Sequence, residues 1–218
     1  MEHVLAKTIL ISQVVELIAN EYKVTLDEAR NRFYDSDVIE MLDDDQTGLY
    51  GQSALYLLSL YENYLKTKCI ETERLLLRKV RKEDAGAMFN NWASDPEVTK
   101  YLTWSTHENI EITKQIINFW LEEEQDPKTY RFMITLKNSC ELIGSIDVVG
   151  YIDNNPEIGY CLSRKYWNKG YGTEAIKLML DFGFNYLNLH SIKLDLMAFN
   201  ERALKCYQKC GLKEYGRR

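Results

Sequence analysis

The hydrophobic positions of the first 68 residues recur every three or four residues. This spacing is typical of amphipathic helices whose apolar side faces a core. Thr25 followed three residues later by Glu28 is a capping-box pattern, which marks the start of one such helix. Helices are expected over residues 7–21, 25–34, 38–42 and 52–65. Residues 1–68 therefore predict a small helical domain.

From residue 69 onward, runs of alternating hydrophobic and polar residues stand between helical patterns. Alternation of this kind indicates strands that are buried on one face. Strands are expected over 71–80, 130–136, 142–152, 157–162 and 192–197, and helices over 82–92, 109–124 and 201–209, with one more helix opening within 167–173. This order predicts an α/β domain (α+β mixed) with a mixed sheet over residues 69–218.

One stretch joins a strand, a glycine-containing turn and a helix start. Gly170 and Gly172 remove side chains that would block close approach to the backbone at this turn. The first amides of a helix lack intrahelical partners, and the helix dipole adds partial positive charge there. A diphosphate would therefore fit on the amides from Lys169 to Thr173. An ordinary strand-to-helix turn that binds no ligand would have the same sequence pattern. Neither a G-x-G-x-x-G fingerprint nor a Gly-Lys-Ser/Thr phosphate loop is present.

The composition narrows the function further. With 45% hydrophobic and 28% charged residues, the chain has the composition of a soluble globular protein, and its apolar runs are too short to span a bilayer. Five scattered cysteines without a Cys-x-x-Cys pair indicate reduced thiols, a cytoplasmic location and no metal site. The net charge of −6 resides in residues 1–68, which hold 6 basic and 12 acidic residues. The sequence contains no stripe of basic residues of the kind that binds nucleic acid.

Two sequence blocks carry a family resemblance. The first is EIGYCL at 157–162 followed by YWNKGYGTEA at 166–175, and the second is NERALKCYQKCGL at 200–212. They resemble the acetyl-CoA motif Gln/Arg-x-x-Gly-x-Gly/Ala, with Trp167 in the Gln/Arg place, and the block Asn-x-x-Ala/Ser-x-x-x-Tyr-x-Lys-x-Gly-Phe of the GCN5-related N-acetyltransferases (GNAT). The nearest branch is that of the ribosomal-protein N-terminal acetyltransferases. The resemblance covers roughly residues 70–218 and implies a GNAT fold with a mostly antiparallel central sheet.

The resemblance implies transfer of an acetyl group from acetyl-CoA, as co-substrate, to a primary amine of a protein N-terminus or a small molecule. The pantetheine arm would pair with the strand 157–162 where it splays from 194–196, and the Leu162 amide would donate to the thioester oxygen. The residues implied in cofactor binding are Ile158, Gly159, Tyr160, Cys161, Leu162, Trp167, Asn168, Lys169, Gly170, Tyr171, Gly172, Thr173, Asn200 and Lys205.

Two residues are expected to act in catalysis. Tyr207 matches the family tyrosine near the cofactor sulfur and is the expected general acid, with a packing role as the alternative. Glu157, at the start of the key strand, is the expected base and would act through water. Asp147, His107 and His190 are lesser candidates that are expected to be structural. The family's first two helices and their loop shape the acceptor site, where Trp104 and Tyr101 are the expected contacts.

The chain departs from the family pattern at its C-terminal end. The family continues beyond Gly211 with two strands, whereas residues 212–218 have room for one. The last strand is expected to be missing, truncated or supplied by another chain, so a homo-oligomer through this sheet edge or through the helical domain is one expectation. A non-catalytic acyl-CoA-binding or sensory module, whose helical domain binds a protein, is the alternative function. A pure interaction protein that has lost the ligand is a further alternative.

Overall fold

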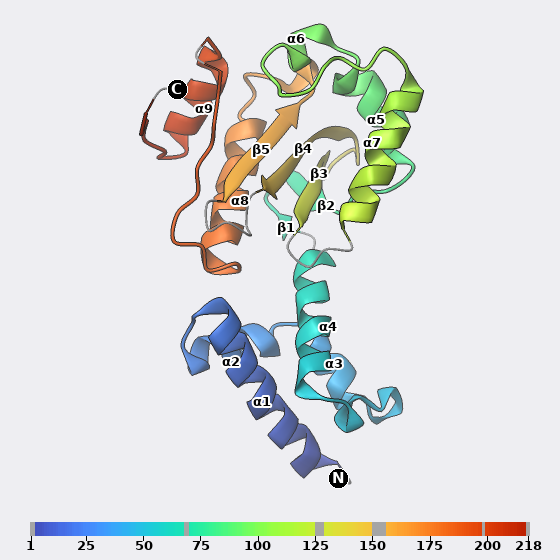
Figure 1. Ribbon diagram of the computed structural model, residues 1–218, viewed down its shortest axis with the longest axis vertical. Coiled ribbons are helices and arrows are strands. Elements are labelled where there is room, and N and C mark those ends of the chain that lie inside the picture. Colours follow the sequence, from blue (N-terminus) through green and yellow to red (C-terminus); the bar gives the residue numbers. More distant parts are fainter. Residues whose placement is uncertain (1–2, 68–69, 125–128, 150–155, 198, 217–218) are drawn as a thin grey trace. The chain divides into compact units, whose positions relative to one another are not determined.

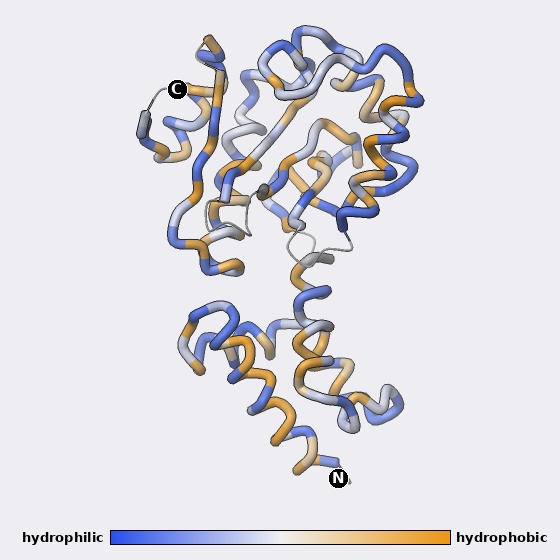
Figure 2. The backbone as a smooth tube through the Cα atoms, viewed as in Figure 1, coloured by the Kyte–Doolittle hydropathy of each residue, from blue (hydrophilic) through white to orange (hydrophobic). Residues whose placement is uncertain are grey.

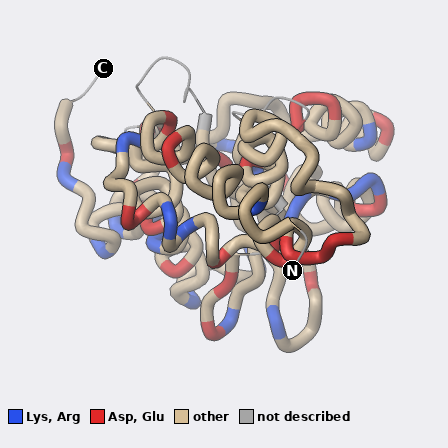
Figure 3. The backbone as a smooth tube through the Cα atoms, turned by 90° about the horizontal axis from the view of Figure 1, so that it is seen from below, with Lys and Arg blue, Asp and Glu red and all other residues tan. Residues whose placement is uncertain are grey.

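The computed structural model describes residues 3–67, 70–124, 129–149, 156–197 and 199–216 (Figure 1). The chain divides into two compact units. One unit contains residues 1–68 together with 186–188, and the other contains the remaining residues. Acidic and basic positions are interspersed along the coloured parts of the chain (Figure 3).

The first unit is helical. Its elements are α1 (Val4–Tyr22), α2 (Leu26–Tyr34), α3 (Asp37–Asp43), the short 3₁₀ turns η1 (Asp45–Thr47) and η2 (Leu49–Gly51), and α4 (Ala54–Thr67). Hydrophobic positions recur along α1 (Figure 2), and Val14, Val15 and Ile18 lie in the unit's core. Thr25 caps α2 as predicted, because its hydroxyl accepts the Glu28 amide at 3.2 Å.

Polar side chains at both ends of α3 make local contacts. The Ser36 hydroxyl, just before α3, donates backward to the Phe33 carbonyl at 2.6 Å and does not cap the helix. The acidic residues at the end of α3 also have partners. The Asp44 side chain accepts the Gln46 amide at 2.9 Å, and Asp45 pairs with Lys7 at 2.6 Å.

The second unit is built on a five-stranded sheet in the order β1-β2-β3-β4-β5, with each neighbouring pair antiparallel. The strands are β1 (Ile70–Glu71), β2 (Leu75–Arg78), β3 (Tyr130–Leu136), β4 (Leu142–Val149) and β5 (Glu157–Leu162). The expected single strand over 71–80 is wrong. The Thr72 hydroxyl accepts the Leu75 amide at 2.9 Å, which folds this stretch into a tight turn between two short strands. The expected end of β4, residues 150–152, lies outside the described residues.

Helices cover both faces of the sheet (Figure 1). One face packs against α5 (Asp84–Met88), the π-helical turn η3 (Phe89–Ala93) and α7 (Ile110–Glu123) around Trp92, Met133 and Cys161. The short helix α6 (Pro96–Thr99) precedes the loop that leads into α7. The other face packs against α8 (Tyr171–Asn185), whose Phe182 ring lies 5.6 Å from that of Tyr130.

The end of the chain forms one helix and no regular strand among the residues described there. The expected strand over 192–197 is wrong, because a single parallel bridge joins Lys193 to Glu157 and no ladder follows it within residues 194–197. α9 (Glu201–Lys209) begins and ends as predicted. The Asn200 side chain accepts the Ala203 amide at 3.1 Å, and Gly211 adopts φ +83° just past the end.

Candidate functional site

The outer edge of β5 forms the first part of the candidate site. On one side β5 pairs with β4. On the other side the Ile158 amide donates to the Lys193 carbonyl at 3.0 Å, and no further bridge is recorded over the described residues 194–197. Because successive residues of a strand direct their backbone groups to opposite sides, the amides of Tyr160 and Leu162 point to this open edge.

Not every predicted strand residue presents its backbone there. The amides of Gly159 and Cys161 point toward β4, and the Ile158 amide already has a partner. The Leu162 carbonyl accepts the Trp167 indole N–H at 2.8 Å, so Leu162 offers a ligand its backbone N–H but not its carbonyl. The open edge therefore offers the amides of Tyr160 and Leu162 to an extended ligand.

The turn that leads from β5 into α8 forms the second part. It contains a 3₁₀ turn, η5 (Arg164–Tyr166), and two residues in left-handed backbone conformations, Asn168 with φ 60° and Gly170 with φ +87°. Residues 168–170 are exposed. Within the described part of the chain, no hydrogen bond is recorded for the backbone amides from 168 to 173. These amides therefore form a ready-made anion site.

The two glycines of this turn have different roles. Gly170 is required by its backbone conformation, which side-chain-bearing residues rarely adopt. Gly172 instead permits close packing, since a Cβ there would lie 3.3 Å from the Tyr160 ring and 3.4 Å from Cys206 Sγ. The backbone course of the turn thus depends on Gly170, and the fit of α8 against β5 and α9 depends on Gly172.

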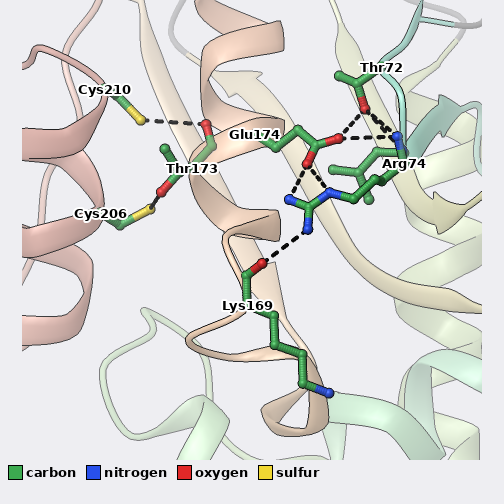
Figure 4. A network of polar contacts seen from close by, with 8 residues as sticks. Thr72, Arg74, Lys169, Thr173, Glu174, Cys206 and Cys210 are labelled. Atoms are coloured by element: carbon green, nitrogen blue, oxygen red, sulfur yellow. Dashed lines mark hydrogen bonds and ion pairs between the residues drawn. The ribbon is translucent and has the colours of Figure 1, made fainter.

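An ion pair fastens this turn to the start of the sheet (Figure 4). Glu174, in the first turn of α8, accepts from Arg74 Nε at 2.7 Å, from Arg74 Nη2 and from the Thr72 hydroxyl. Arg74 Nη1 also donates to the Lys169 carbonyl at 3.2 Å, and its guanidinium lies 4.4 Å from the Tyr171 ring centre. Burial raises the pKa of Glu174, but the hydrogen bonds from Thr72 and Arg74 outweigh it, so its net pKa lies below the usual value.

α9 lies beside the start of α8. Cys206 Sγ is 3.4 Å from the Thr173 hydroxyl, and Cys210 Sγ is 3.6 Å from the Thr173 carbonyl (Figure 4). Both thiols are free, and burial raises the pKa of Cys210 to about 11. Of the two polar residues predicted to bind the cofactor from this segment, Asn200 serves as the helix cap. Lys205 is exposed and pairs with Glu201 at 3.9 Å.

Tyr207, the predicted acid, lies next to the open edge. Its side chain is buried, and its ring centre is 6.0 Å from that of Tyr160. Burial raises the pKa of both phenols, so both remain protonated at neutral pH. A protonated phenol beside the free amides of Tyr160 and Leu162 has the protonation state that a proton donor needs.

Glu157, the predicted base, lies at the other end of β5. Its carboxylate is 3.5 Å from Lys193 Nζ, and its side chain is 29% exposed. The nearby Asp147 accepts from Arg131 at 3.2 Å, and Arg131 also pairs with Glu123 at 2.8 Å. Burial raises the pKa of Asp147. Asp147 therefore belongs to a charge cluster on the α7 side of the sheet, while Glu157 keeps access to solvent.

The predicted acceptor residues lie on the loop between α6 and α7. Trp104 is partly buried in the cluster that covers the α7 face, and its ring centre is 5.1 Å from that of His107. His107 is buried, its Nδ1 lies 2.8 Å from the Thr113 hydroxyl, and burial lowers its pKa. Tyr101 is partly exposed, whereas His190 is exposed. His107 thus has a structural environment, whereas Tyr101 and Trp104 are both partly exposed.

Sequence reasoning missed three charged groups at this site, Arg74, Glu174 and Arg202. The Arg74–Glu174 pair joins residues 100 positions apart, and no spacing rule connects them. Arg202 places its guanidinium carbon 3.2 Å from the centre of the Trp167 ring. A signal existed only for Glu174, whose position in the first helical turn favours an acidic residue. No cluster of three potential metal ligands occurs among the residues described. In the same part of the chain, no helix is long and apolar enough to cross a membrane.

The chain is similar in sequence to known acetyltransferases. Residues 74–213 match the family model of the acetyltransferase (GNAT) domain. The uncharacterized N-acetyltransferase p20 of Bacillus licheniformis is 33% identical over 147 residues, which cover 66% of this chain and 82% of that protein.

Two solved structures share the fold. A ribosomal-protein-S5-alanine acetyltransferase from Vibrio fischeri has a TM-score of 0.59 at 22% identity, covering 68% of this chain and 85% of that one. A spermidine N-acetyltransferase from Vibrio cholerae, in complex with CoA and spermine, has a TM-score of 0.58 at 24% identity, covering 66% and 84%. The domain match leaves residues 1–73 uncovered.

Proposed function

The chain belongs to the acetyltransferases of the GNAT family, and we propose that it transfers an acetyl group from acetyl-CoA to a primary amine. The observation that carries this proposal is the presence of two groups of unpartnered amides, those of Tyr160 and Leu162 on the β5 edge and those of the turn at 168–173. Strand-like amides suit the peptide-like pantetheine arm, and helix-start amides suit a diphosphate. The fit is supported by the exposure of residues 168–170, which leaves this turn accessible to a ligand.

When bound, acetyl-CoA supplies an activated thioester. The Leu162 amide, with the Tyr160 amide beside it on the open edge, is positioned to donate a hydrogen bond to a thioester oxygen that gains negative charge. One such donor contributes on the order of 3 kcal/mol to a transition state. Tyr207 carries the proton that a departing thiolate requires, because burial raises its pKa and keeps the phenol protonated. These residues divide the work between charge stabilisation and proton donation.

The acceptor must lose a proton before it can attack. Glu157 is the proposed base, acting through a water molecule, since its carboxylate is partly exposed at the start of β5. An α-amino group, with a pKa of about 7.7–8.0, needs less help than a lysine amine at about 10.4. The acceptor classes to test first are a protein N-terminus and a polyamine, the classes named for two proteins of the same fold.

The test is thiol release from acetyl-CoA in the presence of an amine panel that contains peptides and polyamines. Acetyl transfer that requires both the amine and Tyr207 supports the proposal. Tight acetyl-CoA binding without turnover, unchanged in Tyr207→Phe, would instead indicate a non-catalytic acyl-CoA-binding module. In that module, we propose, residues 1–68 mediate protein interaction.

A further inference from the structure

One face of α9 lies along the turn that is proposed to hold the diphosphate. Arg202, Cys206 and Cys210 are spaced four residues apart and so share this face. The two thiols contact Thr173, at the helix end of the turn. The Arg202 guanidinium lies over Trp167, at the strand end of the turn. This face of α9 therefore lies beside the segment from Trp167 to Thr173.

The charge of Arg202 is not balanced by a carboxylate in the described structure. No hydrogen bond or ion pair of its guanidinium is recorded among the described residues. The other partly buried arginines of the described chain all have such partners. These are Arg32 with Glu28, Arg78 with Asp84, and Arg131 with Glu123 and Asp147. Arg202 is the exception among them.

The groups that face Arg202 leave its charge largely uncompensated. Tyr160 and Cys161 are close enough to interact electrostatically, but burial raises the pKa of each and keeps both neutral at pH 7. Tyr101 and the exposed Glu97 also interact electrostatically with Arg202, without a recorded ion pair. Partial burial lowers the pKa of Arg202, which means that the cation has lost water without gaining an anion. An anionic ligand at this position would remove that penalty.

We propose that Arg202 is a side-chain ligand of the cofactor diphosphate and completes the anion site formed by the amides of residues 168–173. The inference rests on the proposed function. A guanidinium that stacks on an indole keeps its N–H groups free at its edge, and their fork geometry matches phosphate oxygens. Trp167 stands where the related motif carries Gln or Arg, so the turn has no polar side chain at this position. Arg202, from α9, supplies one.

The diphosphate is a better match for Arg202 than a carboxylate on the acceptor. The guanidinium lies on the first residue of the turn, and the next residue along its helix face, Cys206, contacts Thr173 at the far end of the same turn. A dianion held by the intervening amides would therefore lie between these two contacts.

The test compares three ligands by calorimetric titration of the full-length chain. Acetyl-CoA carries all the phosphates, its 3′-dephospho analogue keeps the diphosphate, and S-acetylpantetheine keeps only the thioester and arm. Arg202→Gln should lower the affinity for acetyl-CoA and for its 3′-dephospho analogue by about tenfold or more, while the affinity for S-acetylpantetheine stays near the wild-type value. Arg202→Lys, which keeps the charge but loses the fork, should lie between Arg202→Gln and the wild type.

The matched control is Lys209→Gln. Lys209 is an exposed cation of the same helix, and its replacement makes the same change in charge. Its acetyl-CoA affinity should remain that of the wild type. An equal loss for all three ligands in Arg202→Gln would show that Arg202 only shapes the pocket, and unchanged affinities would show that it binds no phosphate. A changed acceptor KM with unchanged cofactor affinity would assign Arg202 to the acceptor instead. Failure of the wild-type chain to bind acetyl-CoA would overturn the proposed function and, with it, this inference.

Discussion

Replacing Glu174 with glutamine is expected to loosen the turn that holds the proposed diphosphate site. The carboxylate receives hydrogen bonds from Arg74 and Thr72, and Arg74 in turn holds the Lys169 carbonyl at 3.2 Å. Glutamine keeps the shape of the side chain but removes the charge. Arg74 would then lose its ionic partner, and the turn would lose its fixed connection to the β1–β2 segment.

The expected size of the effect follows from the exposure of the two partners. The Arg74 side chain is 43% exposed and that of Glu174 is 18% exposed, so solvent screens the pair partly. A well-exposed pair contributes at most about 1 kcal/mol, and the glutamine NH2, a donor that faces the Arg74 guanidinium in place of a carboxylate oxygen, adds the loss of a hydrogen bond of about 1 kcal/mol. The free energy of unfolding should therefore fall by about 1–2 kcal/mol. If the whole loss falls on the binding-competent turn, acetyl-CoA affinity falls by about 5- to 30-fold.

Urea unfolding and calorimetric titration with acetyl-CoA measure the two effects on the same variant. Glu71→Gln is the matched control, since Glu71 pairs with Lys137 at 3.0 Å in the same part of the sheet but is 57% exposed. Glu71→Gln should change the free energy of unfolding by no more than about 0.5 kcal/mol, and it should bind acetyl-CoA with the affinity of the wild type. Glu174→Gln with the stability and affinity of the wild type would refute the anchoring role of this ion pair.

Three further predictions concern single residues. Tyr207→Phe should lower kcat by roughly a hundredfold while KM for acetyl-CoA changes little, as measured by steady-state thiol release; an unchanged kcat would remove the tyrosine from the reaction. Gly170→Ala should cost about 1–2 kcal/mol in urea unfolding, because φ is +87° there, whereas Gly86→Ala, in α5 with open space around it, should be neutral or stabilising. Burial lowers the pKa of His107, so as pH falls below about 6.5 the unfolded chain takes up a proton that the folded one does not, and stability is lost. His107→Gln should flatten that loss in urea titrations between pH 7.5 and 5.5, and an unchanged slope would contradict the assignment.

The elements that sequence reasoning located well carry complete local signals. Residues 130–136 and 157–162 alternate cleanly, and both form strands with the expected bounds. The last helix has an Asn200 cap and a Gly211 stop, so both of its ends are encoded nearby. The family was recognised for the same reason, since its motifs are short and contiguous.

The failures have a common physical cause in contacts that local sequence does not encode. The strand expected over 71–80 is broken by the Thr72 hydroxyl, which competes with the ladder for a backbone amide. Residues 192–197 have a strand-like pattern, but a strand also needs a partner, and only Lys193 has one there. The groups that fasten the candidate site, Arg74 and Arg202, come from distant segments and meet only in the folded chain.

The central claim is that the amides of residues 168–173 and the edge of β5 hold acetyl-CoA. Its most direct test is a titration of the ¹⁵N-labelled chain with acetyl-CoA, followed through the backbone amide resonances. We predict large shifts for residues 168–173 with acetyl-CoA, and shifts confined to Tyr160 and Leu162 with S-acetylpantetheine. Resonances of residues 168–173 that stay unmoved while acetyl-CoA binds elsewhere would contradict it.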